Sequence, residues 1–259
     1  MDLGIFGKRA VVCASSQGLG LACATALARE GCLVLVNGRD IGRLDAARAA
    51  ITAATGAAVA GVVADISTEA GRDAIVAACS QADILVNNNA GPPPGQLADW
   101  DHAAWIAALE ANMLAPILLM RAFLPGMRER KFGRIVNITS AMVKSPRPHM
   151  ALSTTARTGV TAFAKAMSFE AAADNVTINN LLPERVDTPR QQFMAERMMK
   201  AQNIDLAEAR RRIAQTVAAK RFGTPAEFAD ACAFLCSAQA GFISGQNLQL
   251  DGGSYPGLI

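Results

Sequence analysis

A serine and an arginine four residues apart, Ser153 and Arg157, are the chemically most informative pair in this sequence. On a helix this spacing places both side chains on one face. Arg157 is a permanent cation with a planar set of N–H donors, so it can polarise a nearby oxygen but cannot shuttle a proton. The preceding loop, AMVKSPRPHM, adds Lys144 and His149. Histidine titrates in the range useful for acid–base catalysis, so the pattern predicts a polarising site whose proton donor is still open.

A second chemical signal is the stretch CASSQGLG at 13–20, between an apolar run and a helical sequence. Gly18 and Gly20 let the backbone approach a ligand closely and turn into the helix, whose free N–H groups suit a pyrophosphate. We therefore expect a dinucleotide to contact Ala14, Ser15, Ser16, Gln17, Gly18, Leu19 and Gly20.

Alternating strands and helices must position these residues. Short apolar runs predict strands at 9–14, 32–37, 58–65, 83–88, 133–139, 176–183 and 246–251, and the stretches between them predict helices at 19–30, 43–55, 70–79, 105–130, 153–173, 190–220 and 225–237. This alternation indicates a parallel sheet covered on both faces. We predict an α/β fold: a single doubly wound, Rossmann-type domain spanning 1–259, with ligands beyond the carboxyl ends of the strands.

Composition argues against several other classes of protein. Of 259 residues, 51% are hydrophobic and 18% charged, which is enough for a folded core. A net charge of +3 without a basic block argues against nucleic acid as a partner. No leader pattern and no apolar run of about 18 residues is visible, so we expect neither secretion nor a membrane span. The six cysteines lack metal-ligand spacing, which favours buried thiols in a reducing cytoplasm and no metal site.

Several dispersed motifs, in the right order, resemble those of the short-chain dehydrogenase/reductase family, in its 3-oxoacyl-acyl-carrier-protein reductase branch. The stretch 13–20 is similar to the family's Thr-Gly-x-x-x-Gly-x-Gly motif, NNNA (87–90) to Asn-Asn-Ala-Gly, and GRIVNITS (133–140) to the strand ending in the catalytic serine. NNLLPERVDTPR (179–190) resembles the nicotinamide-side segment, and the C-terminal region follows the family signature. The resemblance implies an NAD(P)-dependent oxidoreductase that interconverts a carbonyl and an alcohol by hydride transfer.

The same resemblance implies catalytic roles. Ser140 would orient the carbonyl and Asn112 would anchor a proton-relay water, while Ser153 and Arg157 stand where the family has its catalytic tyrosine and lysine. The only tyrosine is Tyr255, so no shift of alignment restores the pair. Because an alkyl hydroxyl is far less acidic than a phenol, which titrates near pH 10, the proton-transfer site must be non-standard.

Three substitutes for the missing acid remain open. Lys144 and His149 both lie in the loop that should border the cleft. The third is a relay from water through Asn112, Ser140, Ser153 and Arg157. We favour Lys144, because it closely follows the strand that presents Ser140.

The residues after the second predicted strand favour NADP, with NAD still possible. Arg39 can pair with a 2′-phosphate, and Gly38 offers no carboxylate to repel one, although Asp40 next to it could instead cap a helix. Asp65 resembles the residue that contacts the adenine. Ala14 replaces the family's first glycine, which is tolerable only where φ is not positive. The resemblance adds as cofactor contacts Ile66, Asn88, Asn89, Ala90, Arg157, Pro183, Val186 and Thr188.

We expect residues 186–221 to form a helical lid over the substrate. Basic residues outnumber acidic ones there, which suits an anionic substrate or a phosphopantetheine arm, or simply a solvated helix face. The helices at 105–130 and 153–173 resemble those that pair subunits in the family, which implies a homotetramer. The leading hypothesis is an NADP-preferring oxidoreductase acting on a small carbonyl or alcohol. The alternatives are a catalytically silent nucleotide-binding or regulatory subunit and an enzyme with nicotinamide-independent chemistry.

Overall fold

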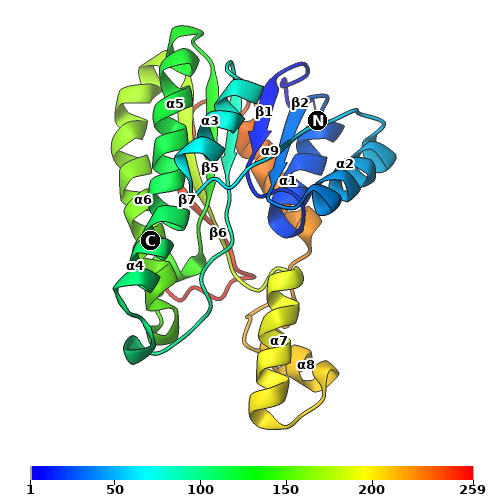
Figure 1. The fold of residues 1–259 in the computed structure, drawn as a ribbon, viewed down its shortest axis with the longest axis vertical. Coiled ribbons are helices and arrows are strands. Elements are labelled where there is room, and N and C mark those ends of the chain that lie inside the picture. The colour runs from blue at the N-terminus through cyan, green and yellow to red at the C-terminus, as the bar shows by residue number, and fades with distance from the viewer. Residues whose placement is uncertain (1, 259) are drawn as a thin grey trace.

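A seven-stranded parallel sheet forms the centre of the computed structural model, which describes residues 2–258 (Figure 1). Its strands lie in the order β3-β2-β1-β4-β5-β6-β7. Their bounds are β1 Arg9–Val12, β2 Leu33–Gly38, β3 Ala60–Val63, β4 Ile84–Asn87, β5 Gly133–Ile138, β6 Val176–Pro183 and β7 Asn247–Leu250. The strand order reverses direction next to β1, which is the doubly wound arrangement. The predicted fold class is confirmed.

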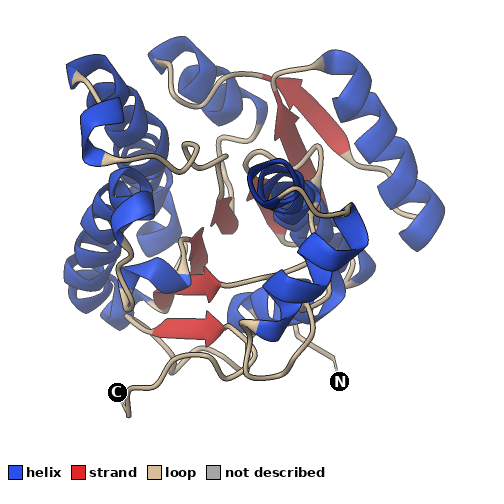
Figure 2. Cartoon of the chain, turned by 90° about the horizontal axis from the view of Figure 1, so that it is seen from below, coloured by secondary structure: helices blue, strands red, loops and turns tan. Residues whose placement is uncertain are grey.

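Helices cover both faces of this sheet (Figure 2). One apolar core packs the sheet against α1 (Gly18–Arg29), α2 (Ile41–Thr55) and α9 (Pro225–Cys236). The other packs it against α3 (Glu69–Ala78), α5 (Ala115–Glu129) and α6 (Ala151–Ala171). Because both faces are buried, most central strand residues are apolar, which explains why the strands read as continuous apolar runs.

The helix predicted at 105–130 is interrupted by one turn of π-helix. α4 (His102–Leu109) leads into the π turn Glu110–Leu114, and α5 follows directly. Pro116 lies two residues after this turn; its ring would clash with the carbonyl four residues earlier, and it has no N–H to donate. A widened turn avoids this clash, and such turns are frequent at functional sites. Here it contains Asn112.

The helical run predicted at 190–220 is two helices, α7 (Pro189–Gln202) and α8 (Leu206–Gln215). Asn203 breaks the run with a positive φ of 50°. The two helices pack on each other around Ala195, Ala209 and Ile213 and stand apart from the layers that cover the sheet (Figure 1). Since α7 follows β6, this helical pair lies at the carboxyl edge of the sheet.

Four asparagine side chains form one continuous hydrogen-bonded row across four strands of the sheet, the asparagine ladder. Asn87 Nδ2 donates to Asn137 Oδ1 at 2.9 Å, Asn137 Nδ2 to Asn180 Oδ1 at 3.0 Å, and Asn180 Nδ2 to Asn247 Oδ1 at 2.8 Å. The four residues are register partners on β4, β5, β6 and β7. A shift of any strand by one residue would move its amide to the opposite face, so the ladder fixes the register of these four strands.

Candidate active site

A cavity of about 860 Å³ opens at the carboxyl edge of the sheet, between the loops that follow the strands and the start of α7. It is lined by most of the residues predicted to bind the cofactor. These are Ala14, Ser16, Gln17, Gly18, Leu19, Arg39, Asp65, Ile66, Asn88, Asn89, Ala90, Arg157, Pro183, Val186 and Thr188. The predicted catalytic residues Ser140 and Ser153 line it too. The volume is within the range of small-molecule sites.

The glycine-rich loop fits an anion at the start of α1. Gln17, at the N-cap, makes no side-chain hydrogen bond to the first turn, so the N–H groups there remain available to a phosphate. A Cβ atom at Gly20 would lie 2.4 Å from the carbonyl oxygen of Ala14, so only glycine allows the helix to approach the loop this closely. Gly20 and the buried Ser15 therefore shape the loop without lining the cavity.

Ala14 adopts a φ of 44°, in the left-handed region that favours glycine. The sequence-based condition that this position should not need a positive φ is therefore not met. Two asparagines hold the strained peptide: Asn37 Oδ1 accepts from the N–H of Ala14 at 3.1 Å, and Asn88 Nδ2 donates to its carbonyl at 3.1 Å. The loop thus keeps the glycine-like conformation at a cost of about 1–2 kcal/mol.

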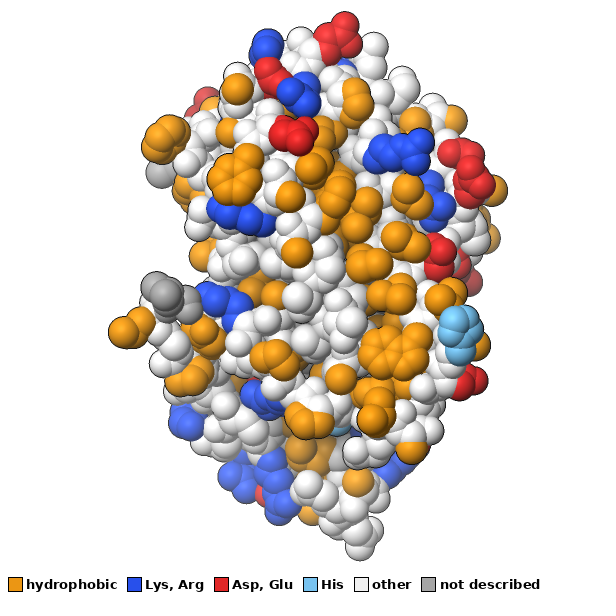
Figure 3. Space-filling view, turned by 90° about the vertical axis from the view of Figure 1, so that its left-hand side faces the viewer, with side chains coloured by type: hydrophobic (Ala, Val, Ile, Leu, Met, Phe, Trp, Pro, Cys, Tyr) orange, Lys and Arg blue, Asp and Glu red, His pale blue; other side chains and the backbone are white. Residues whose placement is uncertain are grey.

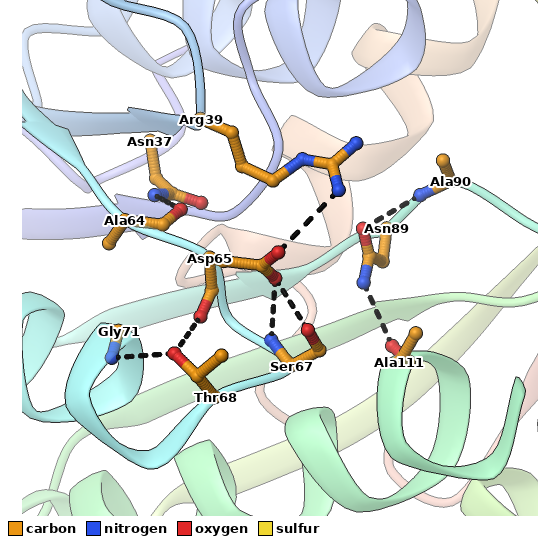
Figure 4. A network of polar contacts seen from close by, with 10 residues as sticks. All are labelled: Asn37, Arg39, Ala64, Asp65, Ser67, Thr68, Gly71, Asn89, Ala90 and Ala111. Atoms are coloured by element: carbon orange, nitrogen blue, oxygen red, sulfur yellow. Dashed lines mark hydrogen bonds and ion pairs between the residues drawn. The ribbon is translucent and has the colours of Figure 1, made fainter. Parts of the chain in front are cut away.

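One end of the cavity contains the residues expected around the adenosine (Figure 4). Arg39 Nη1 lies 3.5 Å from Asp65 Oδ2, and both side chains reach solvent. Partial burial raises the pKa of Asp65, but hydrogen bonds from Ser67 and the charge of Arg39 outweigh this and hold that pKa below its usual value. Asp40 caps α2 by accepting from the N–H of Arg43 at 2.8 Å, which is the structural role left open by the sequence.

At the other end, Arg157 is buried among carbonyl oxygens. Its Nη1 donates to the carbonyls of Ile138 and Thr139, at 2.7 and 2.9 Å, and its Nη2 donates to that of Asn89 at 3.2 Å. These contacts tie the end of β5 to the loop after β4. Burial, together with the charge of Arg190, lowers the pKa of Arg157 to about 10. The guanidinium still remains protonated near neutral pH.

The two serines of the site are both prepared to donate a hydrogen bond. Ser153 Oγ accepts from Arg157 Nε at 3.3 Å, and Ser140 Oγ accepts from the backbone N–H of Met142 at 3.2 Å. A hydroxyl whose lone pair is engaged in this way still has its own O–H to donate. Two such donors line one cavity, and together they can stabilise negative charge on a substrate oxygen.

Asn112 lies behind this site and does not line the main cavity. It is buried, its Nδ2 donates to the carbonyl of Ala90 at 3.4 Å, and its Oδ1 has no partner among the described residues. It borders a second cavity of about 20 Å³, together with Asn87 and Arg157. Asn87 Oδ1 also has no partner in the described chain. A polar space of this size suits a single water molecule.

Lys144, the favoured proton donor, does not border the cleft as expected. Its Nζ lies 4.7 Å from the centre of the Tyr255 ring, and it is not among the residues that line the cavity. The short 3-10 turn Ala141–Val143 after Ser140 directs the chain away. His149, by contrast, lines the cavity. A catalytic role for Lys144 therefore remains a prediction without support from its position.

Sequence reasoning missed several cations at this end of the cavity. Arg147, Arg185 and Arg190 line it beside Arg157, whereas Glu184 is the only carboxylate near them in the described lining. Arg147 Nη2 pairs with Glu184 Oε1 at 3.3 Å. In the sequence, prolines flank Arg147 in PRP (146–148), and a proline precedes Arg190 in TPR (188–190). Proline stiffens the chain at these two arginines, and this was the available signal.

The first βα turn of the parallel sheet leads into a helix whose start can bind an anion, and a polar cavity opens at the carboxyl edge of the sheet. Together these features define a dinucleotide-binding protein of the Rossmann class. The comparisons with known proteins are more specific. A family model described as "Enoyl-(Acyl carrier protein) reductase" matches residues 13–255. The chain belongs to the short-chain dehydrogenase/reductase family.

Relatives cover almost the whole chain. The NADPH-dependent reductase BacG of Bacillus subtilis is 30% identical over 256 residues, 97% of this chain and 99% of its own. A subunit, BbsC, of the (2S)-[(R)-hydroxy(phenyl)methyl]succinyl-CoA dehydrogenase of Thauera aromatica is 32% identical, over 95% of this chain and 94% of its own. The crystal structure of L-sorbose reductase from Gluconobacter frateurii, complexed with NADPH and L-sorbose, superposes with a TM-score of 0.94 at 31% identity and covers all of both chains. The predicted class, an NAD(P)-dependent oxidoreductase of carbonyl/alcohol pairs with NADP favoured, is confirmed.

Proposed function

We propose that this protein uses NADPH to reduce a small carbonyl compound to an alcohol, and the reverse, with two serines holding the substrate oxygen. The observation that supports this is the paired geometry of Ser140 and Ser153, each accepting an N–H bond and each free to donate into the cavity. Arg157 strengthens the donor character of Ser153 through its Nε–H. Nicotinamide, when bound, supplies the hydride.

The residues around the cavity suit the remaining parts of NADPH. Arg39 is exposed and lies at the end where a 2′-phosphate would extend, and its partner Asp65 is near enough to the ribose and adenine side to bind there. The start of α1 offers free N–H groups for the pyrophosphate. Val186 and Thr188 also line the cavity, where Thr188 lies beside Gly18, and they follow the strand that the family uses on the nicotinamide side.

Of the three proton routes that the sequence leaves open, His149 has the best positional support. It is the one histidine among the described residues that line the cavity, and histidine is the side chain that ordinarily gains and loses a proton near neutral pH. The relay through Asn112 includes Arg157, whose guanidinium stays protonated near neutral pH and therefore does not pass a proton on. We therefore assign proton delivery to His149, either directly or through water, and treat Lys144 as the competing residue.

The first test is a fluorescence titration with NADPH, with NADH alongside, followed by transfer of deuterium from labelled NADPH to a panel of ketones and aldehydes. Micromolar binding and a deuterated alcohol are expected. A matched pair, His149→Gln and Lys144→Gln, then separates the proton routes. Loss of rate in His149→Gln alone supports the assignment, whereas loss in Lys144→Gln alone transfers it to Lys144.

We further propose that α7 and α8 act as the lid expected at 186–221, and that the protein is a cytoplasmic homotetramer. The helical segment His102–Glu129 supports the assembly. By length and composition it is apolar enough to span a membrane, yet one side of α5 packs on the sheet. Apolar side chains gather on the side of the molecule that carries α4, α5 and α6 (Figure 3). Ile106 of α4 and Phe169 of α6 are exposed. A second copy would cover them. Six unpaired cysteines, five of them buried, suit a reducing compartment.

A silent subunit is the competing function, since the relative from Thauera aromatica is by name one subunit of a dehydrogenase. Such a chain would bind nucleotide and a partner without transferring hydride. Saturable NADPH binding with no deuterium transfer to any carbonyl, by protein that is folded and assembled, would favour it. Turnover without nucleotide would instead support nicotinamide-independent chemistry.

A further inference from the structure

The cations of the substrate end are not balanced by acids. Four guanidinium groups, those of Arg147, Arg157, Arg185 and Arg190, line this part of the cavity, and Glu184 is the only carboxylate there among the described residues. At the adenosine end the balance is different, because Arg39 and Arg43 are matched by Asp40 and Asp65. The excess of positive charge therefore lies away from the place expected for the 2′-phosphate of NADP.

Three other arginines of the lid form ion pairs and lie outside the cavity lining. Arg210 pairs with Asp187 at 2.9 Å, and Arg211 and Arg212 pair with Glu208 at 2.7 and 2.6 Å. None of these arginines lines the cavity. Ion pairs thus neutralise part of the basic character of 186–221 outside the cavity, and these three arginines do not contribute to the charge of its lining.

Of the four arginines at the substrate end, Arg147 and Arg185 pair with Glu184, whereas Arg157 and Arg190 have no carboxylate partner among the described residues. Arg190 Nη2 donates to the carbonyl of Pro92 at 2.9 Å, so its side chain crosses from the start of α7 to the loop after β4. That loop is also next to Ser153: a Cβ atom at Gly91 would lie 3.4 Å from both Ser153 Oγ and Arg157 Nη2. Both guanidiniums therefore reach the loop after β4 at the same part of the cavity, and the charge of Arg190 acts on Arg157.

This arrangement is unfavourable without an anion. Burial, and then the charge of Arg197, lowers the pKa of Arg190, just as burial and Arg190 lower that of Arg157. Arg185 Nε is buried and lies 3.9 Å from Glu184 Oε1, but it has no hydrogen-bond partner among the described residues. Desolvated charges and unpaired donors cost free energy unless a ligand neutralises them. Guanidinium groups in particular match the two oxygens of a carboxylate.

We infer that the substrate is a carbonyl compound that also has a carboxylate, and that Arg190 binds this carboxylate at the Ser153 end of the cavity, where Arg157 adds a second positive charge. This inference rests on the proposed reductase function. The oxygen that accepts a hydrogen bond from Ser140 and Ser153 is then the carbonyl oxygen, and the acid group lies under the first turn of α7. Uncharged ketones of the same shape are poor substrates.

The probes are three oxo acids, 2-oxobutanoate, acetoacetate and 4-oxopentanoate, each compared with its methyl ester. Initial rates with NADPH give kcat/KM for both members of each pair, and calorimetry on the complex with NADP⁺, which has no hydride to transfer to them, gives their dissociation constants. For at least one pair, the acid is expected to bind at least tenfold more tightly than the ester. Equal binding of acid and ester in all three pairs would overturn the inference.

Arg190→Gln is the decisive variant, and Lys200→Gln is its matched control, because Lys200 lies on the same helix, is exposed and does not line the cavity. We expect Arg190→Gln to weaken the acid about tenfold or more, to leave the ester and NADPH within about twofold, and Arg190→Lys to recover part of the loss. Weakening of NADPH rather than the acid would place Arg190 on the cofactor and overturn the proposal. Absence of NADPH binding by the unmodified protein is a different result, which would instead reject the proposed function.

Discussion

The two ends of the cavity differ in how closely they follow the family pattern. At the adenosine end, the glycine turn, Arg39 and Asp65 line the cavity, as expected from the motifs they resemble, and Ala14 has a positive φ of 44°. At the substrate end, Ser153 and Arg157 stand where the resemblance implies a tyrosine and a lysine, and Arg190 adds a cation. Under the proposed function, cofactor binding and proton transfer depend on separate loops of one sheet, so the second can change while the first is kept.

Ser140→Ala tests the substrate end most severely. Removing one of two donors to a developing oxyanion is expected to lower kcat by about 10²–10³-fold, since such donors act mainly on the transition state. Single-turnover deuterium transfer from labelled NADPH measures this, and the NADPH dissociation constant should stay within about twofold. Ser145→Ala, in the same loop but outside the cavity lining, is the control. A drop of less than about fivefold would mean that the substrate oxygen is held elsewhere.

The variant Arg157→Met tests whether Arg157 also stabilises the fold by holding the end of β5 to the loop after β4. The variant leaves the carbonyls of Ile138 and Thr139 without their guanidinium donor. We expect a loss of about 2–3 kcal/mol in unfolding free energy, or roughly 4–12 °C in Tm for a chain of this size. Thermal unfolding followed by circular dichroism measures it. An unchanged Tm would show that Arg157 serves a ligand alone.

Arg39→Gln sharpens the comparison at the cofactor end. Loss of a charged donor to a 2′-phosphate should raise the NADPH dissociation constant about tenfold, or about 1.4 kcal/mol, and leave NADH unaffected. Fluorescence titration with both nucleotides tests this, with Arg48→Gln on the same side of the molecule as the control. Parallel weakening of NADPH and NADH would contradict a role at the 2′-phosphate.

Ala14→Gly has the smallest expected effect. Glycine adopts a φ of 44° without the steric cost of a Cβ atom, but it also gains entropy in the unfolded chain. A net stabilisation of up to about 1 kcal/mol should raise Tm by roughly 2–4 °C. Gly20→Ala provides the opposite control, because its Cβ would meet the Ala14 carbonyl. A lower Tm in Ala14→Gly would mean that the loop is not strained.

The fold and the cofactor loop could be predicted from local sequence signals. The positions at which long side chains end in space could not. Apolar runs and glycine positions depend on neighbours in sequence, so the sheet and the residues of 13–20 followed directly. The positions of Lys144 and Arg190 depend on how a turn directs the chain and on contacts between distant loops, such as that of Arg190 with Pro92, 98 residues away. Spacing from Ser140 therefore favoured Lys144, and the composition of 186–221 concealed the one lid arginine that lines the cavity.

The asparagine ladder has a consequence for how this sequence can diverge. Each inner amide both donates and accepts, so replacing one asparagine leaves an unpaired group on a buried neighbour among Asn87, Asn137 and Asn180, at about 1–3 kcal/mol. Replacing all four by apolar residues of similar shape removes the polar groups together and can be nearly neutral. Single steps between these two states pass through less stable intermediates. We therefore expect homologous lineages to inherit the four positions as a block, either all amide or all apolar, with mixed sets rare.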